Sequence, residues 1–160
     1  MSILSNIFFS YFSPVKIFND RIIKKTESQL FGILVFGCLI TLISQFPLLY
    51  YRSLSSLDPL IGMFSANLVA VLFITPLFFY VCSGIFFLVF RLFKFRVTSL
   101  QSRMSLFWSF ALVSPWGLVN SLIKVTNCPI WFEISFSIFI FLIFCMFFYY
   151  FLKVCSEYKG

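Results

Sequence analysis

Residues 60–90 read LIGMFSANLVAVLFITPLFFYVCSGIFFLVF and contain no charged side chain. A helix of this length reaches about 46 Å, whereas roughly 20 apolar residues are enough to cross about 30 Å of hydrocarbon. Asp58 and Pro59 just before it are typical of a helix start, with the carboxylate as N-cap and proline at the first helical position. Either residues 59–67 lie at the membrane interface and 68–90 cross, or the whole stretch is one strongly tilted helix.

Three other stretches have the length and apolar character of a membrane span, namely residues 30–51, 104–123 and 130–152. The whole chain is 61% hydrophobic and 11% charged, whereas soluble domains carry about 25% charged residues. Each spanning segment has to satisfy its own backbone hydrogen bonds in lipid. The sequence therefore predicts an all-α, polytopic transmembrane helical bundle of about four spans, comprising residues 30–152.

The cations are distributed unequally between the connections. Arg52 and Lys124 lie in the connections on one side, and the other ten of the 12 Lys and Arg residues lie in the arm 1–29, the connection 91–103 and the tail 153–160. By the positive-inside rule, both termini are cytoplasmic and the protein is a multi-pass membrane protein. Because these cations flank helices and lie among aliphatic residues, we expect no nucleic-acid partner.

The arm 1–29 is expected to contain a short amphipathic helix over residues 14–26. Ser13 and Pro14 have the residue types of an N-cap and a first helical position. Four apolar side chains follow helical spacing along one face: Phe12, Val15, Phe18 and Ile22. Such a basic amphipathic helix lies among lipid headgroups. It either anchors the first span or docks a partner.

The cytoplasmic side should therefore contact anionic headgroups, and with them a membrane-protein partner or a second copy of the chain. The candidate contact residues are the cations of the arm and of the connection 91–103, together with one aromatic residue of the arm. They are Lys16, Phe18, Arg21, Lys24, Lys25, Arg91, Lys94, Arg96 and Arg103.

Residues with catalytic chemistry are scarce in this chain. It has no histidine, five acidic residues without catalytic or metal-binding spacing, and five scattered cysteines without a CxxC pair. We therefore expect no enzymatic activity, no catalytic residues, no cofactor and no metal.

Uncharged polar residues and prolines lie inside the spans. Such polar residues join helices by hydrogen bonds or, alternatively, line a path for a neutral solute, and prolines bend helices. The candidate kinks and intramembrane polar contacts are Gln45, Pro47, Asn67, Pro76, Pro115 and Asn120.

Residues 12–125 contain a series of short motifs in a characteristic order. They are Pro14-x-x-x-Phe18 in the arm, Gln45-x-Pro47, the run Pro76–Tyr80 (PLFFY), and Arg103-x-x-Leu106-Phe107-Trp108 followed by Ser114-Pro115. This order resembles bacterial members of the Yip family, small multi-spanning membrane proteins related to the eukaryotic Rab-GTPase-interacting Yip proteins. The resemblance implies a polytopic helical protein of the bacterial inner membrane, with a cytoplasmic N-terminus.

In the eukaryotic relatives, the resemblance implies roles in vesicle trafficking, Rab binding and membrane shaping. Rab binding is not carried over, because the arm has fewer than thirty residues and the spans number four where those relatives commonly have five. We expect a non-enzymatic scaffold or accessory protein of membrane organisation. The alternative is a small transporter or channel for an uncharged solute, and a third hypothesis is a pore-forming lysis protein.

Overall fold

The computed structural model describes residues 3–23, 25–55, 59–92, 97–126 and 128–157. Every regular element in these ranges is helical, which confirms the predicted all-α bundle. Three helices are long and apolar enough to cross a membrane, and a bent pair of shorter helices supplies a fourth crossing if it counts as one span.

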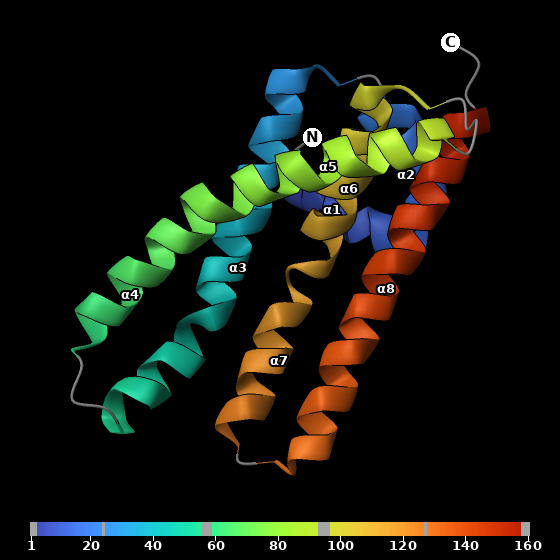
Figure 1. Cartoon of the computed structure of the whole chain (residues 1–160). Helices are drawn as coiled ribbons and strands as arrows, with labels where there is room; N and C mark the ends of the chain where they lie inside the picture. The colour runs from blue at the N-terminus through green and yellow to red at the C-terminus, as the bar shows by residue number, and fades with distance from the viewer. Residues whose placement is uncertain (1–2, 24, 56–58, 93–96, 127, 158–160) are drawn as a thin grey trace.

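The helices run alternately down and up the bundle (Figure 1). The four crossings are α3 (Glu27–Ser55), the series α4 (Leu60–Val69), η2 (Ala70–Ile74) and α5 (Thr75–Leu92), the pair α6 (Ser99–Val113) and α7 (Trp116–Val125), and α8 (Ile130–Glu157). α3 and α6 begin at one end of the bundle, and α5 and α8 finish at the same end. We call it the terminal end, because the N-terminal helices lie near it and the last helix, α8, finishes there. The opposite end is the distal end.

The second crossing is a single helical run from Leu60 to Leu92, without a break near residue 67. It crosses the bundle obliquely, in contrast to α7 and α8 (Figure 1). Residues 60–67 thus continue into the same helix as residues 68–90, as the tilted-helix alternative requires. Pro59 takes the cap position directly before the helix, and Asp58 lies outside the described residues.

A π-helical turn, η2, precedes Pro76 within this run. Proline has no N–H to donate to the preceding turn, so a helix has to adjust around it. Here both the backbone N–H and the hydroxyl of Thr75 reach the carbonyl of Ala70, five residues earlier, with the hydroxyl at 3.3 Å. Pro76 itself is buried, and α5 continues beyond it to Leu92.

Pro115 breaks the third crossing, as its sequence position predicts. The axes of α6 and α7 differ by 43° across the break. The missing N–H of Pro115 leaves the carbonyl of Ala111 without its usual donor. The hydroxyl of Ser114 donates to that carbonyl at 3.0 Å and replaces the lost bond. Pro47, by contrast, lies inside α3, which continues to Ser55.

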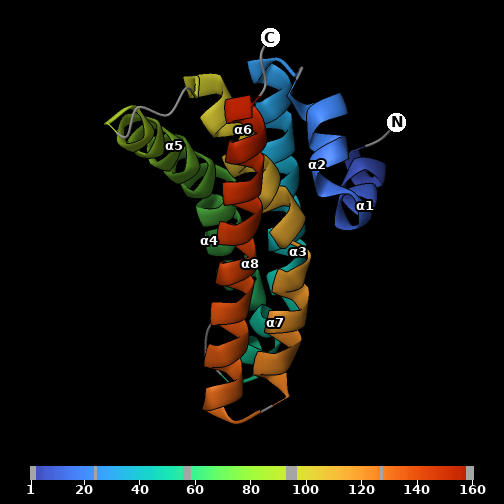
Figure 2. The ribbon, with the colours of Figure 1, turned by 90° about the vertical axis from the view of Figure 1, so that its right-hand side faces the viewer.

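Helix α6 forms the centre of the terminal half. It packs against α3, α5 and α8 and also against the N-terminal helix α1 (Ile3–Phe12). Figure 2 shows α5 on one side of this half and the N-terminal helices on the other. Most of α6 is buried, including the large side chains of Phe107, Trp108 and Leu112. Small buried serines, such as Ser105 and Ser109, let neighbouring helices approach closely.

Replacing Gly37 with alanine is expected to lower the free energy of unfolding by about 1–3 kcal/mol, because the position is already in tight contact. A Cβ on Gly37 would lie 3.0 Å from two ring carbons of Phe110. The Phe110 ring cannot move aside easily, since it packs on Phe79 with ring centroids 4.4 Å apart. The measurement is the thermal unfolding of the purified protein in detergent.

Gly32 on the same helix is the matched control, because a Cβ there meets nothing within 4 Å. Its replacement by alanine should leave stability unchanged or raise it slightly through helix propensity. Equal melting temperatures for the Gly37→Ala and Gly32→Ala variants would contradict the close contact between α3 and α6.

Candidate functional site

The N-terminal arm docks onto the terminal half of the bundle. It folds as α1, α2 (Pro14–Ile17) and the π-helical segment η1 (Phe18–Ile22). Pro14 opens α2, as predicted, but the side chain of Ser13 makes no capping hydrogen bond. The regular structure that begins at residue 14 ends at residue 22 rather than 26, and α1 is a further helix that the sequence pattern did not indicate.

The predicted apolar face of the arm is divided by this docking. Phe18 and Ile22 are fully buried, whereas Phe12 is 77% exposed and Val15 43% exposed. The ring of Phe18 stacks on the ring of Phe151 in α8, with centroids 4.5 Å apart and planes 17° from parallel. Phe18 was expected to contact lipid or a partner, but it is enclosed by the protein's own helices.

Tyr11 connects the arm to the break in the third crossing. Its hydroxyl donates to the backbone carbonyl of Leu112, in the last turn of α6, and is also hydrogen-bonded to the side chain of Trp116 at the start of α7. Burial raises the pKa of the Tyr11 hydroxyl, and the Trp116 hydrogen bond offsets part of that rise. The hydroxyl therefore stays protonated and remains a donor at neutral pH.

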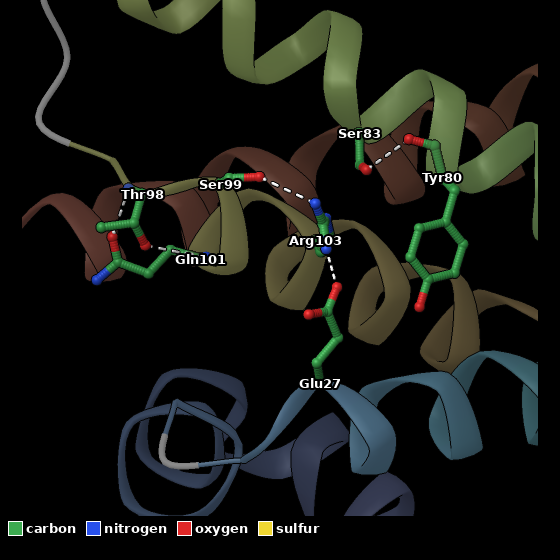
Figure 3. Close-up of polar contacts among 7 residues, drawn as sticks. All are labelled: Glu27, Tyr80, Ser83, Thr98, Ser99, Gln101 and Arg103. Atoms are coloured by element: carbon green, nitrogen blue, oxygen red, sulfur yellow. Dashed lines mark hydrogen bonds and ion pairs between the residues drawn. The ribbon is translucent and has the colours of Figure 1, made fainter.

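Arg103 connects three helices at the terminal end (Figure 3). Its guanidinium pairs with the carboxylate of Glu27 in the first turn of α3 and donates to the hydroxyl of Ser99 at 3.2 Å. The same group lies over the ring of Tyr80 in α5, 5.6 Å from its centroid, in a cation–π arrangement. Arg103 therefore holds α3, α5 and α6 together, and its side chain is 29% exposed.

Local hydrogen bonds fix the start of α6 beside Arg103. The hydroxyl of Thr98 accepts from the backbone N–H of Gln101 at 3.3 Å, and the Gln101 side chain accepts from the Thr98 N–H at 2.9 Å (Figure 3). This capping box satisfies two otherwise unpaired donors. The hydroxyl of Ser102 donates across to the carbonyl of Ser83 in α5 at 3.4 Å.

The predicted contact cations fall into groups with different surroundings. Lys16 and Arg91 are exposed, Lys25 is half-buried, and Arg103 is engaged with Glu27. Lys153, which the sequence places in the tail, is exposed at the end of α8. Lys24, Lys94 and Arg96 lie outside the described residues, and only the backbone of Arg21 is described.

The predicted intramembrane polar residues differ in their surroundings. The amide oxygen of Asn120 accepts from the hydroxyl of Ser137 at 3.3 Å and joins α7 to α8. The amide nitrogen of Asn67 is enclosed and has no hydrogen-bond partner among the described residues. Gln45 is half-buried on α3. Structural contact between helices accounts for Asn120 but not for Asn67.

Sequence reasoning missed Glu27 and Tyr11, the two residues that connect most of this region. Glu27 is separated from Arg103 by 76 positions, and Tyr11 from Leu112 by 101. No local spacing reveals such pairs. The one available indication for Glu27 was its place just before a segment that has no further charged residue until Arg52, since a carboxylate there is expected at a water boundary.

Within the described ranges, no group of three or more His, Cys, Asp or Glu side chains is placed to hold a metal ion. In comparisons with known proteins, no family model, no curated protein and no solved structure matches the chain. The function is therefore interpreted from the geometry. The terminal end combines a rigid core, formed around α6 and Arg103, with exposed cations at its rim.

Proposed function

We propose that the chain is a non-enzymatic scaffold or accessory protein of the bacterial cytoplasmic membrane, of the Yip type, with both termini in the cytoplasm. The observation that carries the proposal is the position of the cations. Lys16, Arg91 and Lys153 are exposed on three different elements, α2, α5 and α8, at the terminal end. The distal end carries Arg52 and Lys124 on helix ends.

Exposed cations at one end of a membrane bundle attract anionic headgroups, each by about 1 kcal/mol near the surface. The docked arm supports a binding role of this kind, because it holds Lys16 in a fixed position relative to Arg91 instead of on a flexible tail. The rest of the exposed surface is mainly apolar along the spans, with large side chains such as Phe73, Leu77 and Trp131 in the open. A partner in the membrane can pack there.

Reporter fusions test the orientation. A green fluorescent protein fused after Gly160 should fluoresce, and alkaline phosphatase inserted in the connection 56–58 should be active, because the two positions should lie on opposite sides of the inner membrane. An inactive phosphatase together with a non-fluorescent green fluorescent protein would contradict the proposed orientation.

Site-specific photo-crosslinking in cells tests the scaffold role. A photoreactive residue replaces Lys16 or Arg91 at the terminal end, or Phe73, a 70% exposed side chain within the second crossing, as the control. We expect protein adducts of the same mass from positions 16 and 91 and lipid adducts from position 73. Lipid adducts alone at all three positions would contradict a scaffold that recruits a protein partner.

One observation favours the second candidate, a small transporter or channel for an uncharged solute. The enclosed amide nitrogen of Asn67 has no partner in the described chain, and an unsatisfied buried polar group costs about 1–3 kcal/mol. If Asn67 serves only packing, the Asn67→Leu variant should melt at a higher temperature than the wild type. If it serves a solute, solute flux into proteoliposomes should disappear in that variant.

Asn120→Leu is the comparison variant, since it removes a satisfied amide that accepts from Ser137. We expect it to lower the melting temperature. Flux in the wild type no greater than in empty liposomes removes the transporter hypothesis, whatever the stability of the two variants.

A further inference from the structure

Two cavities of similar chemistry lie at opposite ends of α8. The first, of about 300 Å³, lies at the terminal end, where Lys153, Ser156 and Glu157 of α8 face the apolar side chains of Phe90 and Val97. The second, of about 330 Å³, lies at the distal end. It is lined by Lys124, Glu133, Ser137 and three isoleucines of α8, Ile130, Ile134 and Ile138. Each cavity therefore presents one ammonium group, one carboxylate and a serine hydroxyl beside an apolar wall, and Tyr149 adds a phenol to the lining of the terminal cavity.

The spacing of these groups along α8 corresponds to the thickness of a bilayer. Glu133 and Lys153 are separated by twenty positions of one continuous helix, which at 1.5 Å per residue is about 30 Å. The hydrocarbon core of a membrane is also about 30 Å thick. When α8 crosses the membrane, the charged groups of the two cavities thus lie at the two headgroup levels.

The presence of a lysine and a glutamate in the same cavity indicates which kind of lipid headgroup fits there. Lys153 and Glu157 are one turn apart on the same helix face, so a ligand in the terminal cavity meets both. A phosphate suits the lysine, but a purely anionic headgroup also meets the glutamate, and like charges repel. A headgroup with both a phosphate and an amine matches both side chains. A primary ammonium has N–H groups to donate to the carboxylate, as lysine does.

We propose that each cavity binds the headgroup of a phospholipid with a primary amine, of the phosphatidylethanolamine type, one in each leaflet. The lysine contacts the phosphate and the glutamate accepts from the ammonium group. A volume near 300 Å³ is at the lower end for ligand pockets, so it takes the headgroup and not the acyl chains. The acyl chains lie along the exposed apolar side of α8, which includes Ile138, Leu142 and Met146.

The proposal requires that α8 spans the bilayer and does not depend on the scaffold role. The test is lipid retention by the full-length protein, purified in mild detergent and measured by native mass spectrometry. The protein is offered phosphatidylethanolamine, phosphatidylglycerol or phosphatidylcholine in separate mixtures. We expect up to two phosphatidylethanolamine molecules per chain and weaker retention of the other two lipids.

Variants assign each bound lipid to its cavity. Glu157→Gln and Lys124→Gln should each remove one of the two bound lipids, with about a tenfold weaker retention at the altered cavity, because each loses a charge-assisted hydrogen bond. Lys153→Arg should retain the phosphate contact and thus the lipid. Asp20→Asn, which removes an exposed charge outside both cavities, is the control and should bind as the wild type does.

Retention of phosphatidylglycerol equal to or above that of phosphatidylethanolamine would overturn the proposal, and so would unchanged retention in Glu157→Gln. Each variant is first compared with the wild type by thermal unfolding, so that a loss of lipid is not a loss of fold. A protein that retains no lipid but still forms adducts at Lys16 and Arg91 would contradict this inference and leave the scaffold role supported.

Discussion

Replacement of Trp108 by alanine is expected to lower the free energy of unfolding by about 3–5 kcal/mol, the range for truncating a large buried aromatic side chain. Trp108 is 1% exposed and is the largest fully buried side chain of the described core. It lies on α6, which packs against α1, α3, α5 and α8. A cavity at this position therefore removes contacts with several helices at once. Thermal unfolding in detergent measures the effect.

Trp108→Phe is the control that separates packing from hydrogen bonding. The indole nitrogen of Trp108 is buried without a hydrogen-bond partner among the described residues, so phenylalanine removes an unsatisfied donor while it keeps most of the apolar volume. We expect this variant to be much closer to the wild type than Trp108→Ala. Equal destabilisation in both variants would show that the indole N–H has a partner in the folded protein.

Replacement of Phe18 by alanine is expected to release the arm from the bundle. The side chain is fully buried and stacks on Phe151, and loss of a buried phenylalanine costs about 3–5 kcal/mol. An arm of three short helical segments has few other large anchors, so such a loss exceeds what local helix formation can restore. Trypsin cleavage after Lys16 and Lys25 should become much faster in the purified variant.

Val15→Ala is the matched control, because Val15 lies on the same arm but is 43% exposed. It should be cleaved at the wild-type rate. Cleavage of Phe18→Ala at the wild-type rate would mean that the other buried contacts of the arm, such as those of Tyr11, Ile7 and Ile22, are enough to hold it. In that case, a second variant, Phe18→Ala with Tyr11→Phe, should show the release, since it also removes the hydrogen bond to Leu112.

Docking of the arm on the bundle limits which of its side chains can contact lipid or a protein partner. The sequence suggested that its apolar face lies among headgroups or receives a partner. Phe18, the aromatic residue of that face that was expected to make these contacts, instead packs against α8. In the proposed scaffold role, recognition therefore depends on the exposed cations, such as Lys16. The rings of Phe8 and Phe12, which contact one another with centroids 5.7 Å apart, are among the apolar groups of the arm that remain exposed.

The predicted and observed helices agree where local chemistry decides the backbone. The break at Pro115 and the start of α2 at Pro14 follow from a ring that fixes φ and removes a donor. The second crossing shows the limit of what local sequence can predict. The length of residues 60–90 predicted either an interfacial segment followed by a span or one tilted helix, and the structure has one unbroken helical run to Leu92. It accommodates Pro76 by a π-helical turn, which no spacing of apolar residues could indicate.

The sequence by itself determined the class of protein, the number of candidate crossings and the uneven distribution of cations, because hydropathy and charge are properties of each segment alone. Only the tertiary structure decided that α6 lies at the centre, that Glu27 pairs with Arg103, and that Phe18 is buried while Val15 is not. The apolar residues of a membrane helix look alike whether they face lipid or protein. Which of them meet another helix depends on residues far away in the chain, and hydropathy does not contain that information.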